Sequence, residues 1–416
     1  MTKTRDCDCD SLPDPLLPIE EAQARIEAEV APVGETEIVP LAQAAGRVLA
    51  EEVCARALTP PFDNSAMDGY AVKLVDFAGE GPWTLPVTGR VLAGSVPPAR
   101  FDGAVQVLTG APVPEGTDAV VMQEHVTREG DAITLTAAPE PRANIRRAGG
   151  DMAPGDRLLS PGTRLGAREI AAAAAGGHGA LRVRRRVRVA FLISGDELRP
   201  AGEPLEGAQI WDVNNPALAA ALHRPDVEVT QMVHGADTAE ATRAALMRLS
   251  AEADLIITSG GVSVGVADHV KPEFLALGGA LLFSKVSIKP GKPVSLGRLR
   301  DSYWLGLPGN PFSALATYTL FGRQIVARLT GAAFDPGVRP VVLAQALRHK
   351  PGRAELRLAR LTGFDEAGRA LAEPASATHS HRVATLSDAD GMLMIPAEVA
   401  ELEAGKMLNF LPFGDL

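Results

Sequence analysis

The fold of this chain is decided by residues 254–311, which read DLIITSGGVSVGVADHVKPEFLALGGALLFSKVSIKPGKPVSLGRLRDSYWLGLPGNP. The first apolar run, residues 255–257, is bounded by turn-forming residues and predicts a buried strand. It leads into a loop of glycine, serine and threonine, and then into a helical pattern with Asp268 at the N-cap position. Glycines let the backbone approach a ligand, and a helix N-terminus attracts negative charge. This order predicts a site for an anion.

The same stretch concentrates lysine. Four of the eight lysines lie between positions 271 and 292, although 33 of the 41 lysine and arginine residues are arginine. Lysine presents a compact point charge, so its use here favours a phosphate or another oxyanion as the ligand. Lys289-Pro-Gly-Lys292 predicts a stiff cationic turn, and Lys285 lies just before it. A solvated charged hairpin is the alternative, which the adjacent glycine loop disfavours.

The segment before this stretch alternates strands with helices. Apolar runs predict strands at residues 189–193, 227–233 and 255–257, and a long helix is predicted at residues 312–329. The alternation predicts a multidomain α/β protein whose central sheet, within residues 187–336, is doubly wound and mostly parallel. Ligands of such sheets bind at the carboxyl ends of the strands, where Glu197 and Asp237 lie. Each acid alone could be a helix cap, so their convergence on one edge carries the functional argument.

The remainder of the chain divides into flanking parts. Short strands and turns predict an all-β insertion domain over residues 55–153, and residues 337–416 read as a C-terminal β domain resembling a barrel. Residues 18–54 and 154–186 form a discontinuous N-terminal linker domain, and residues 1–17 a disordered tail. Within the linker domain, helical patterns occur at residues 19–30, 41–53 and 165–175, and a basic run at residues 181–188 predicts an exposed strand or linker.

Composition limits the possible partners and the compartment. The net charge of −10 and an aromatic content of 4% argue against nucleic-acid binding. Three cysteines provide no disulfide framework, and we find neither a signal peptide nor an apolar run of membrane length. We therefore expect a cytoplasmic protein that binds neither nucleic acid nor a membrane.

Two polar loops interrupt the β pattern of the insertion. The first places Asp68 beside Gly69 and Tyr70, and the second begins with Thr109. Asp and Asn often form capped turns, which is one interpretation of the first loop, and a loop facing a substrate or metal is the other.

The residues alone leave a set of acids and a set of bases. No GxGxxG or GxxxxGK[ST] motif is present, and no two histidines have metal-ligand spacing on a helix. Carboxylates can hold Mg²⁺ while lysines neutralise phosphate or another oxyanion, so the residues indicate phosphate-ester chemistry or oxyanion transfer. The set comprises Asp68, Asp151, Glu197, Asp237, Asp268, Lys285, Lys289 and Lys292.

Six motifs carry a resemblance to a known family. They occur in the order PPFDNSAMDGYAV, TGAPVPEGTDAVV, ISGDEL, TSGGVSVGVAD, KPGKPV and GLPGNP. The chain thereby resembles the molybdopterin molybdenumtransferases, the MoeA family, which is shared with the E domain of gephyrin. The resemblance spans nearly everything after the tail. It implies a molybdopterin-binding fold and an enzyme of molybdenum cofactor biosynthesis. Such an enzyme inserts molybdenum from molybdate into adenylylated molybdopterin and releases AMP, aided by Mg²⁺ or another divalent cation.

The resemblance also assigns roles to matching residues. It implies catalytic roles for Asp68, Thr109, Glu197, Asp268, Lys285 and Lys289. It implies binding of the pterin or molybdate by Ser259, Gly260, Gly261, Ser263, Lys289, Lys292, Pro308, Asn310, Pro311 and Ser380. It implies metal binding by Asp151, Glu197, Asp237 and Asp268. The chain departs from the family pattern at Gly150 and Val266, where acids are common, and Arg353, Arg357 and Arg360 compete for one basic role.

The resemblance further implies an elongated homodimer. In such a dimer the site lies between the α/β domain of one subunit and the β insertion of the other, so Asp68 and Thr109 serve the partner's site. A molybdopterin adenylyltransferase and downstream proteins that handle the molybdenum cofactor are the expected partners. Two alternatives stay open: a molybdopterin adenylyltransferase, and a non-catalytic pterin-binding scaffold. The β insertion and C-terminal domain argue against the first, and the retained acids and lysines against the second.

Overall fold

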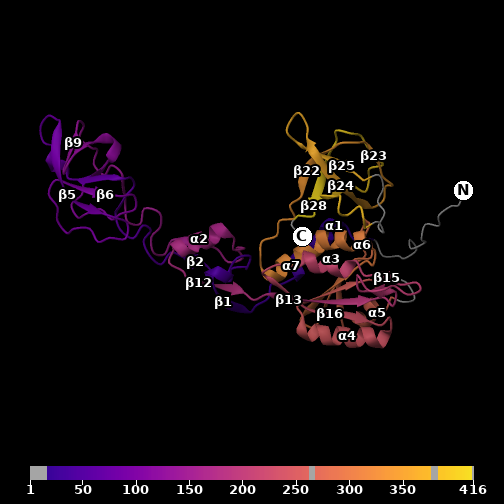
Figure 1. The fold of residues 1–416 in the computed structure, drawn as a ribbon. Helices are drawn as coiled ribbons and strands as arrows, with labels where there is room; N and C mark the ends of the chain where they lie inside the picture. Colours follow the sequence, from indigo (N-terminus) through magenta and orange to yellow (C-terminus); the bar gives the residue numbers. More distant parts are fainter. Residues whose placement is uncertain (1–15, 262–267, 376–382, 415–416) are drawn as a thin grey trace.

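The computed structural model describes residues 16–261, 268–375 and 383–414. Figure 1 shows an elongated molecule with a β-rich insertion at one end and α/β layers at the other, on which a second β region is stacked. A small region that contains α2 (Ala167–Ala175) connects the two ends. The predicted fold class is confirmed, since a mostly parallel central sheet is combined with separate β sheets and a closed C-terminal barrel.

The central sheet has six strands in the order β16-β13-β17-β21-β20-β18. The first four are parallel, and β20 and β18 add an antiparallel edge. The predicted strands are confirmed. The apolar runs of β13 and β17 are buried on both faces of the sheet, whereas β16 lies at the edge and is partly exposed. The bounds are β13 (Val187–Ser194), β16 (Val227–Gly235), β17 (Leu255–Ser259), β18 (Ala280–Ser284), β20 (Ser295–Leu299) and β21 (Ser302–Leu307).

Alternate residues of the strands enter two different cores. Phe191 packs in the core beneath α1, α3 and the helical run near residue 320, whereas Leu192 packs in the core with α4 and α5. Because successive side chains of a strand point to opposite faces, both layers of helices are required to bury the sheet. Figure 1 shows these two layers. The helices are α1 (Ile19–Glu29), α3 (Asn214–Ala221), α4 (Ala239–Glu252) and α5 (Val270–Ala276).

The helix predicted at residues 312–329 is present, with a change of pitch in its middle. It begins with Pro311 at its first turn, which suits the fixed φ of proline. One π turn, Tyr318–Gly322, joins α6 (Pro311–Thr317) to α7 (Arg323–Thr330). Single π turns are often found at functional sites.

The linker region corrects one prediction. The expected helix at residues 41–53 is wrong, because only Leu41–Gln43 forms a short 3-10 turn. Beyond it the backbone is extended, and Val48 and Leu49 form bridges with Arg164 and Val183. Burial of these apolar residues in a small β core outweighs their helical spacing. The core includes β1 (Thr36–Pro40) paired with β12 (Ala180–Arg184), and β2 (Val53–Cys54) paired with β11 (Arg157–Leu159).

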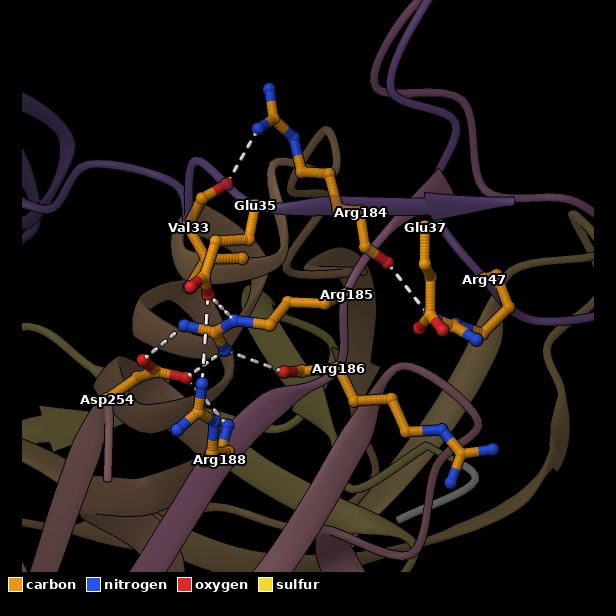
Figure 2. Close-up of polar contacts among 9 residues, drawn as sticks. All are labelled: Val33, Glu35, Glu37, Arg47, Arg184, Arg185, Arg186, Arg188 and Asp254. Carbon is orange, nitrogen blue, oxygen red and sulfur yellow. Dashed lines mark hydrogen bonds and ion pairs between the residues drawn. The ribbon is translucent and has the colours of Figure 1, made fainter. Parts of the chain in front are cut away.

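The basic run at residues 181–188 is partly strand, as predicted, but one of its arginines is largely buried. Arg185 donates from Nη1 and Nη2 to both carboxylate oxygens of Asp254, at 2.6 and 2.8 Å, and from Nε to Glu35 (Figure 2). The bonds to Asp254 first, and then the bond to Glu35, raise the pKa of Arg185 above its ordinary value. Asp254 also accepts from the backbone N–H of Arg188 at 2.8 Å. This arginine clamp fastens the linker region to the start of β13 and β17.

The insertion contains a six-stranded sheet in the order β7-β4-β6-β5-β9-β8. Its strands are β4 (Gly69–Val72), β5 (Trp83–Val91), β6 (Ala104–Val107), β7 (Ala119–Met122), β8 (Thr127–Glu129) and β9 (Ala132–Leu135). Short 3-10 turns lie at Leu74–Phe77 and Gln123–His125. β3 (Asn64–Ser65) pairs with β10 (Ile145–Arg146) beside this sheet.

The C-terminal region is a closed five-stranded barrel. The order β24-β25-β22-β28-β26 returns to β24, and β19 (Ile288–Lys289) pairs in parallel with β24 on the outside of this ring. The barrel strands are β22 (Arg339–Leu343), β24 (Ala354–Phe364), β25 (Ala370–Pro374), β26 (Gly391–Ile395) and β28 (Met407–Pro412). Two short pairs complete the fold, β14 (Leu198–Arg199) with β15 (Ile210–Trp211) and β23 (Leu347–Arg348) with β27 (Glu401–Leu402).

Candidate active site

Most of the residues predicted for the site meet at the carboxyl edge of the parallel strands. Ser259 at the end of β17 pairs with Leu307 at the end of β21. Ser284 at the end of β18 pairs with Ser295, where the antiparallel β20 begins. The loops that leave these strand ends therefore emerge along one edge. They carry Glu197, Asp237, Gly260, Gly261, Lys285, Lys289, Lys292, Pro308, Asn310 and Pro311.

Three carboxylates crowd together at one end of this edge. The backbone N–H of Asp237 lies 3.4 Å from Oδ1 of Asp196. Burial raises the pKa of Asp237, and the negative charges of Asp196 and Glu197 raise it further. A backbone hydrogen bond from Asp196 and the charge of His269 oppose this rise. The predicted acids Glu197 and Asp237 are therefore close neighbours.

The glycine turn after β17 is held from two sides. Gly260 and Gly261 have φ of +89° and +66°, which side chains other than hydrogen rarely allow. The N–H of Gly260 donates to the carbonyl of Leu307 at 3.1 Å. The Nδ2 of Asn214 donates to Oγ of Ser259 and to the carbonyl of Gly309, both at 2.7 Å. Asn214 thus joins the predicted glycine turn to the predicted proline turn.

The proline turn follows directly from β21. Pro308 is buried, whereas Asn310 is exposed. Asn310 occupies the N-cap position of α6 in an extended conformation, and its side chain makes no capping hydrogen bond. The turn brings exposed polar groups next to the glycine turn at the sheet edge.

The lysine turn, residues 285–292, is hydrogen-bonded to a residue near the N-terminus and to a strand of the C-terminal barrel. The N–H of Leu17 donates to the carbonyl of Lys285 at 3.0 Å, and the N–H of Ser287 donates to the carbonyl of Leu17 at 2.8 Å. On the other side, the N–H of Ala354 donates to the carbonyl of Ser287 at 3.1 Å. The side chain of Lys289 is 44% exposed and lies 3.8 Å from Oε2 of Glu355. The predicted cationic turn is therefore ordered and accessible.

Asp268, which was predicted at the N-cap of a helix, lies one residue before the N-cap of α5. His269, rather than Asp268, is the N-cap residue of α5, and its side chain makes no capping hydrogen bond. Asp268 is half-buried and is the first described residue after the glycine loop. Because His269 lies near enough to Asp237 to affect its pKa, the start of α5 lies close to the three carboxylates.

Within the insertion, two predicted residues contact each other. The N–H and the hydroxyl of Thr109 donate to Oδ1 of Asp68 at 2.7 and 2.8 Å. The N–H bond first, and then the hydroxyl bond, lower the pKa of Asp68. Gly69 follows on β4, where an added Cβ would lie 2.0 Å from the carbonyl oxygen of Val121. Only glycine fits there, so the turn that presents Asp68 depends on it.

Asp68, Thr109 and Asp151 are not brought to the sheet edge of their own chain. The N–H of Asp151 donates to the carbonyl of Thr59 at 2.9 Å, at the root of the insertion. Figure 1 shows the insertion strands β5, β6 and β9 far from β13 and β16. A single chain therefore presents two separate groups of predicted residues.

Comparisons with known proteins cover the whole length of this arrangement. Residues 17–177 match the MoeA N-terminal region (domain I and II), residues 190–328 a probable molybdopterin binding domain, and residues 340–413 the MoeA C-terminal region (domain IV). A Haemophilus influenzae molybdopterin molybdenumtransferase is 34% identical over 96% of this chain and 100% of its own length. The chain belongs to the molybdopterin molybdenumtransferase family.

Further relatives of the family agree. Molybdopterin molybdenumtransferase 2 of Mycobacterium tuberculosis is 36% identical over 92% of this chain and 97% of its own. Two solved structures of a molybdopterin biosynthesis MoeA protein from Pyrococcus horikoshii each have a TM-score of 0.81. They are 30% and 28% identical, and cover 96% and 95% of this chain and 99% of theirs.

The family implies a divalent cation, and the carboxylates at the sheet edge are the candidate ligands for it. Among residues 16–261, 268–375 and 383–414, no group of three or more His, Cys, Asp or Glu side chains is arranged to hold a metal ion. The donor chemistry nevertheless fits Mg²⁺, because oxygen ligands are what this ion prefers. The raised pKa of Asp237 also reflects negative charges that a cation would offset. Asp196, which was not among the predicted site residues, lies beside Asp237 in this cluster.

Two residues that contact the site were not predicted from the sequence, and some predicted residues lie outside the part of the chain that the structure describes. Asn214 and Glu355 were missed because their roles depend on contacts with distant segments. The only available signal was the position of Asn214 after a strand end. Ser263, Ser380, Val266 and residues 1–15 of the tail predicted over residues 1–17 lie outside the described residues. Of the three arginines that compete for one basic role, Arg357 is the one that is buried, where it is paired with Glu355 of the barrel.

No helix in the described residues is long and apolar enough to cross a membrane.

Proposed function

We propose that this chain inserts molybdenum from molybdate into adenylylated molybdopterin and releases AMP. The observation that carries the proposal is the gathering of the glycine turn, the acid loops and the lysine turn at one edge of the α/β sheet. Both substrates are anions, and an edge with clustered lysines and backbone N–H groups is suited to bind them. The relatives named molybdopterin molybdenumtransferase match along the full chain, which supports this chemistry for the whole molecule.

Each charged group has a proposed role. Lys289 and Lys292 bind molybdate, and Lys285 neutralises the phosphoanhydride. Ser259, Gly260 and Gly261, together with the turn of Pro308, Asn310 and Pro311, hold the pterin phosphate. Water attacks the phosphoanhydride, and AMP departs with the electron pair of the bond that breaks, leaving the pterin phosphate. The two dithiolene thiols then lose their protons as two Mo–S bonds form, and one oxygen of molybdate leaves with these protons as water.

The proposed metal ligands are Glu197, Asp237 and Asp268 of one subunit, together with Asp151 from the insertion of the other subunit. Mg²⁺ bound there would neutralise charge on the phosphates during cleavage. These carboxylates would hold the ion at the end of the edge opposite the lysines. This division keeps the acids from pairing directly with the cationic groups that molybdate needs.

A homodimer completes the proposed site. Asp68 and Thr109 lie on the far insertion, so they reach a sheet edge only if a second copy supplies it. Closed two-fold dimers are the commonest assembly and place two equivalent sites at such an interface. We propose that Asp68 orients the substrate in the partner's site. We retain the domain boundaries at residues 55–153, 187–336 and 337–416, a cytoplasmic location, and exchange of the pterin with an adenylyltransferase and downstream cofactor-handling proteins.

The test is one incubation with two readouts. Purified protein, adenylylated molybdopterin and Mg²⁺ are combined with or without molybdate, and AMP release and activation of an apo molybdoenzyme are followed together. Both signals should appear only with molybdate. Synthesis of the adenylylated pterin from ATP would indicate an adenylyltransferase instead, and tight pterin binding without either signal would indicate a scaffold.

A further inference from the structure

A buried carboxylate of the C-terminal barrel contacts three basic side chains. Glu355 is 1% exposed, and its Oε1 accepts from Nε and Nη2 of Arg357 at 2.8 and 2.7 Å. Its Oε2 lies 2.9 Å from Nδ1 of His349 and 3.8 Å from Nζ of Lys289. Arg357 and His349 are themselves buried. Glu355 is therefore the anion that holds these three side chains together.

The three partners are held in different ways. Arg357 also donates from Nη2 to the carbonyl of Arg348 at 3.0 Å, so its guanidinium is fixed on the barrel. Lys289 is too far from Oε2 for a hydrogen bond, and 44% of its side chain is exposed. The carboxylate thus attracts the ammonium of Lys289 without taking up its N–H donors. The partly exposed ammonium is therefore accessible to an anion at the sheet edge.

The backbone reinforces this arrangement. β19 pairs in parallel with β24, with Ile288 opposite Ala354 and Lys289 opposite Glu355. The position of the lysine is therefore set by a barrel strand, although the lysine itself lies at the start of a turn. A lysine side chain has a flexible four-carbon stem, and restraining it before binding lowers the entropy cost of binding an anion.

The cluster has more contacts than a structural ion pair needs. Oε1 alone satisfies Arg357, whereas Oε2 faces His349 and the exposed Lys289. We infer that Glu355 is a positioning residue which holds the ammonium of Lys289 ready for molybdate, an inference that rests on the function proposed above. The C-terminal barrel then contributes to molybdate affinity through a residue that never touches molybdate.

The test is a double-mutant cycle with Glu355→Gln and Lys289→Ala, measuring the apparent KM for molybdate, the KM for adenylylated molybdopterin and the Tm. Glu355→Gln keeps the shape and removes the charge. It should raise the KM for molybdate about tenfold and leave the pterin KM within about twofold, as loss of a supporting partner does elsewhere. In the Lys289→Ala background, Glu355→Gln should cause no further rise.

Each other outcome has a distinct meaning. Normal molybdate use by Lys289→Ala would refute the proposed role of that lysine, and with it the basis of the inference. A defective Lys289→Ala with a normal Glu355→Gln would overturn the inference alone, and so would effects that multiply in the double variant. Asp365→Asn is the matched control, because it breaks an ion pair with Arg369 in the turn after β24 and should leave both KM values unchanged. If Glu355→Gln does not fold, Glu355→Asp shortens the side chain, keeps the charge and enters the same cycle.

Discussion

Oδ1 of Asp68 accepts two hydrogen bonds from a single residue, Thr109, one from its backbone N–H at 2.7 Å and one from its hydroxyl at 2.8 Å. The two residues belong to separate loops of the insertion, 41 positions apart. The sequence assigned a role to each of them without linking them. Their contact makes the two loops one polar surface, with the second oxygen of Asp68 directed elsewhere.

Thr109→Val should raise the pKa of Asp68 towards its ordinary value of 3.8, because one of its two donors is lost. A carboxyl whose pKa is lowered by folding stabilises the fold above the unfolded value, and loses this contribution as pH falls through the folded value. The stability difference between parent and variant should therefore be present at neutral pH and vanish in acid. NMR titration of the Asp68 carboxyl measures the shift. Thr134→Val is the control, since Thr134 contacts Thr84 instead; an equal effect in both variants would contradict this account.

Mixing two strongly impaired variants should restore activity if the site is shared. Asp68→Ala removes a residue of the insertion, and Lys289→Ala removes one of the sheet edge, so a mixed dimer retains one intact site. After exchange of subunits in an equal mixture, about a quarter of the parental activity is expected for a two-fold dimer. AMP release from the mixture measures it, with each variant alone and an Asp68→Ala/Lys289→Ala double variant as controls. No recovery in a mixture proven to contain mixed dimers would place both residues in one subunit's site.

Asp237→Asn should stabilise the fold at neutral pH when divalent cations are absent. Folding raises the pKa of Asp237 through burial and the charges of Asp196 and Glu197. For such a group, ionisation opposes folding, so the parent loses stability as pH rises from the ordinary value of 3.8 through the folded value. The two proteins should converge in acid, below that ordinary value. Added Mg²⁺ should raise the Tm of the parent more than that of the variant, and an identical Mg²⁺ response would remove Asp237 from the proposed ligands. Asp301→Asn, a change at a fully exposed acid of the same domain, is the control.

Arg185→Ala should lower the free energy of unfolding by about 1–3 kcal/mol, because Asp254 and Glu35 lose charged hydrogen bonds in a partly exposed site. Arg185→Lys should recover only part of this loss, since an ammonium cannot match both oxygens of Asp254. Denaturant unfolding measures both variants. Arg186→Ala is a strong control, because Figure 2 shows Arg186 contributing its carbonyl oxygen, which alanine retains. If Arg185→Ala and Arg186→Ala lowered the free energy of unfolding by similar amounts, the hydrogen bonds of the Arg185 side chain would not be the cause.

The α/β region was predictable because its strands are continuous apolar runs between turns, and because parallel topology sends their carboxyl ends to one edge. Residues 41–53 were misread since their apolar spacing suits a helix, while their burial depends on pairing with residues more than a hundred positions later. The acids, glycines and lysines of the edge lie in recognisable motifs. Asn214 and Glu355 do not, because an Asn near a helix start or a Glu in a strand acquires meaning only from partners 95 and 66 positions away.

The hydrogen bonds around the lysine turn have a consequence for biosynthesis. The turn lies near residue 289, but it is fastened by Leu17 on one side and by Ala354 on the other. When the ribosome has synthesised the whole α/β sheet, it has therefore not yet synthesised the barrel strand whose Ala354 fixes the lysine turn. The nascent chain acquires the parts of an anion site early, and the geometry of that site only when the barrel emerges. A chain cut short after the sheet would contain the strands of the α/β core but would lack the hydrogen bond from the barrel that fixes the lysine turn.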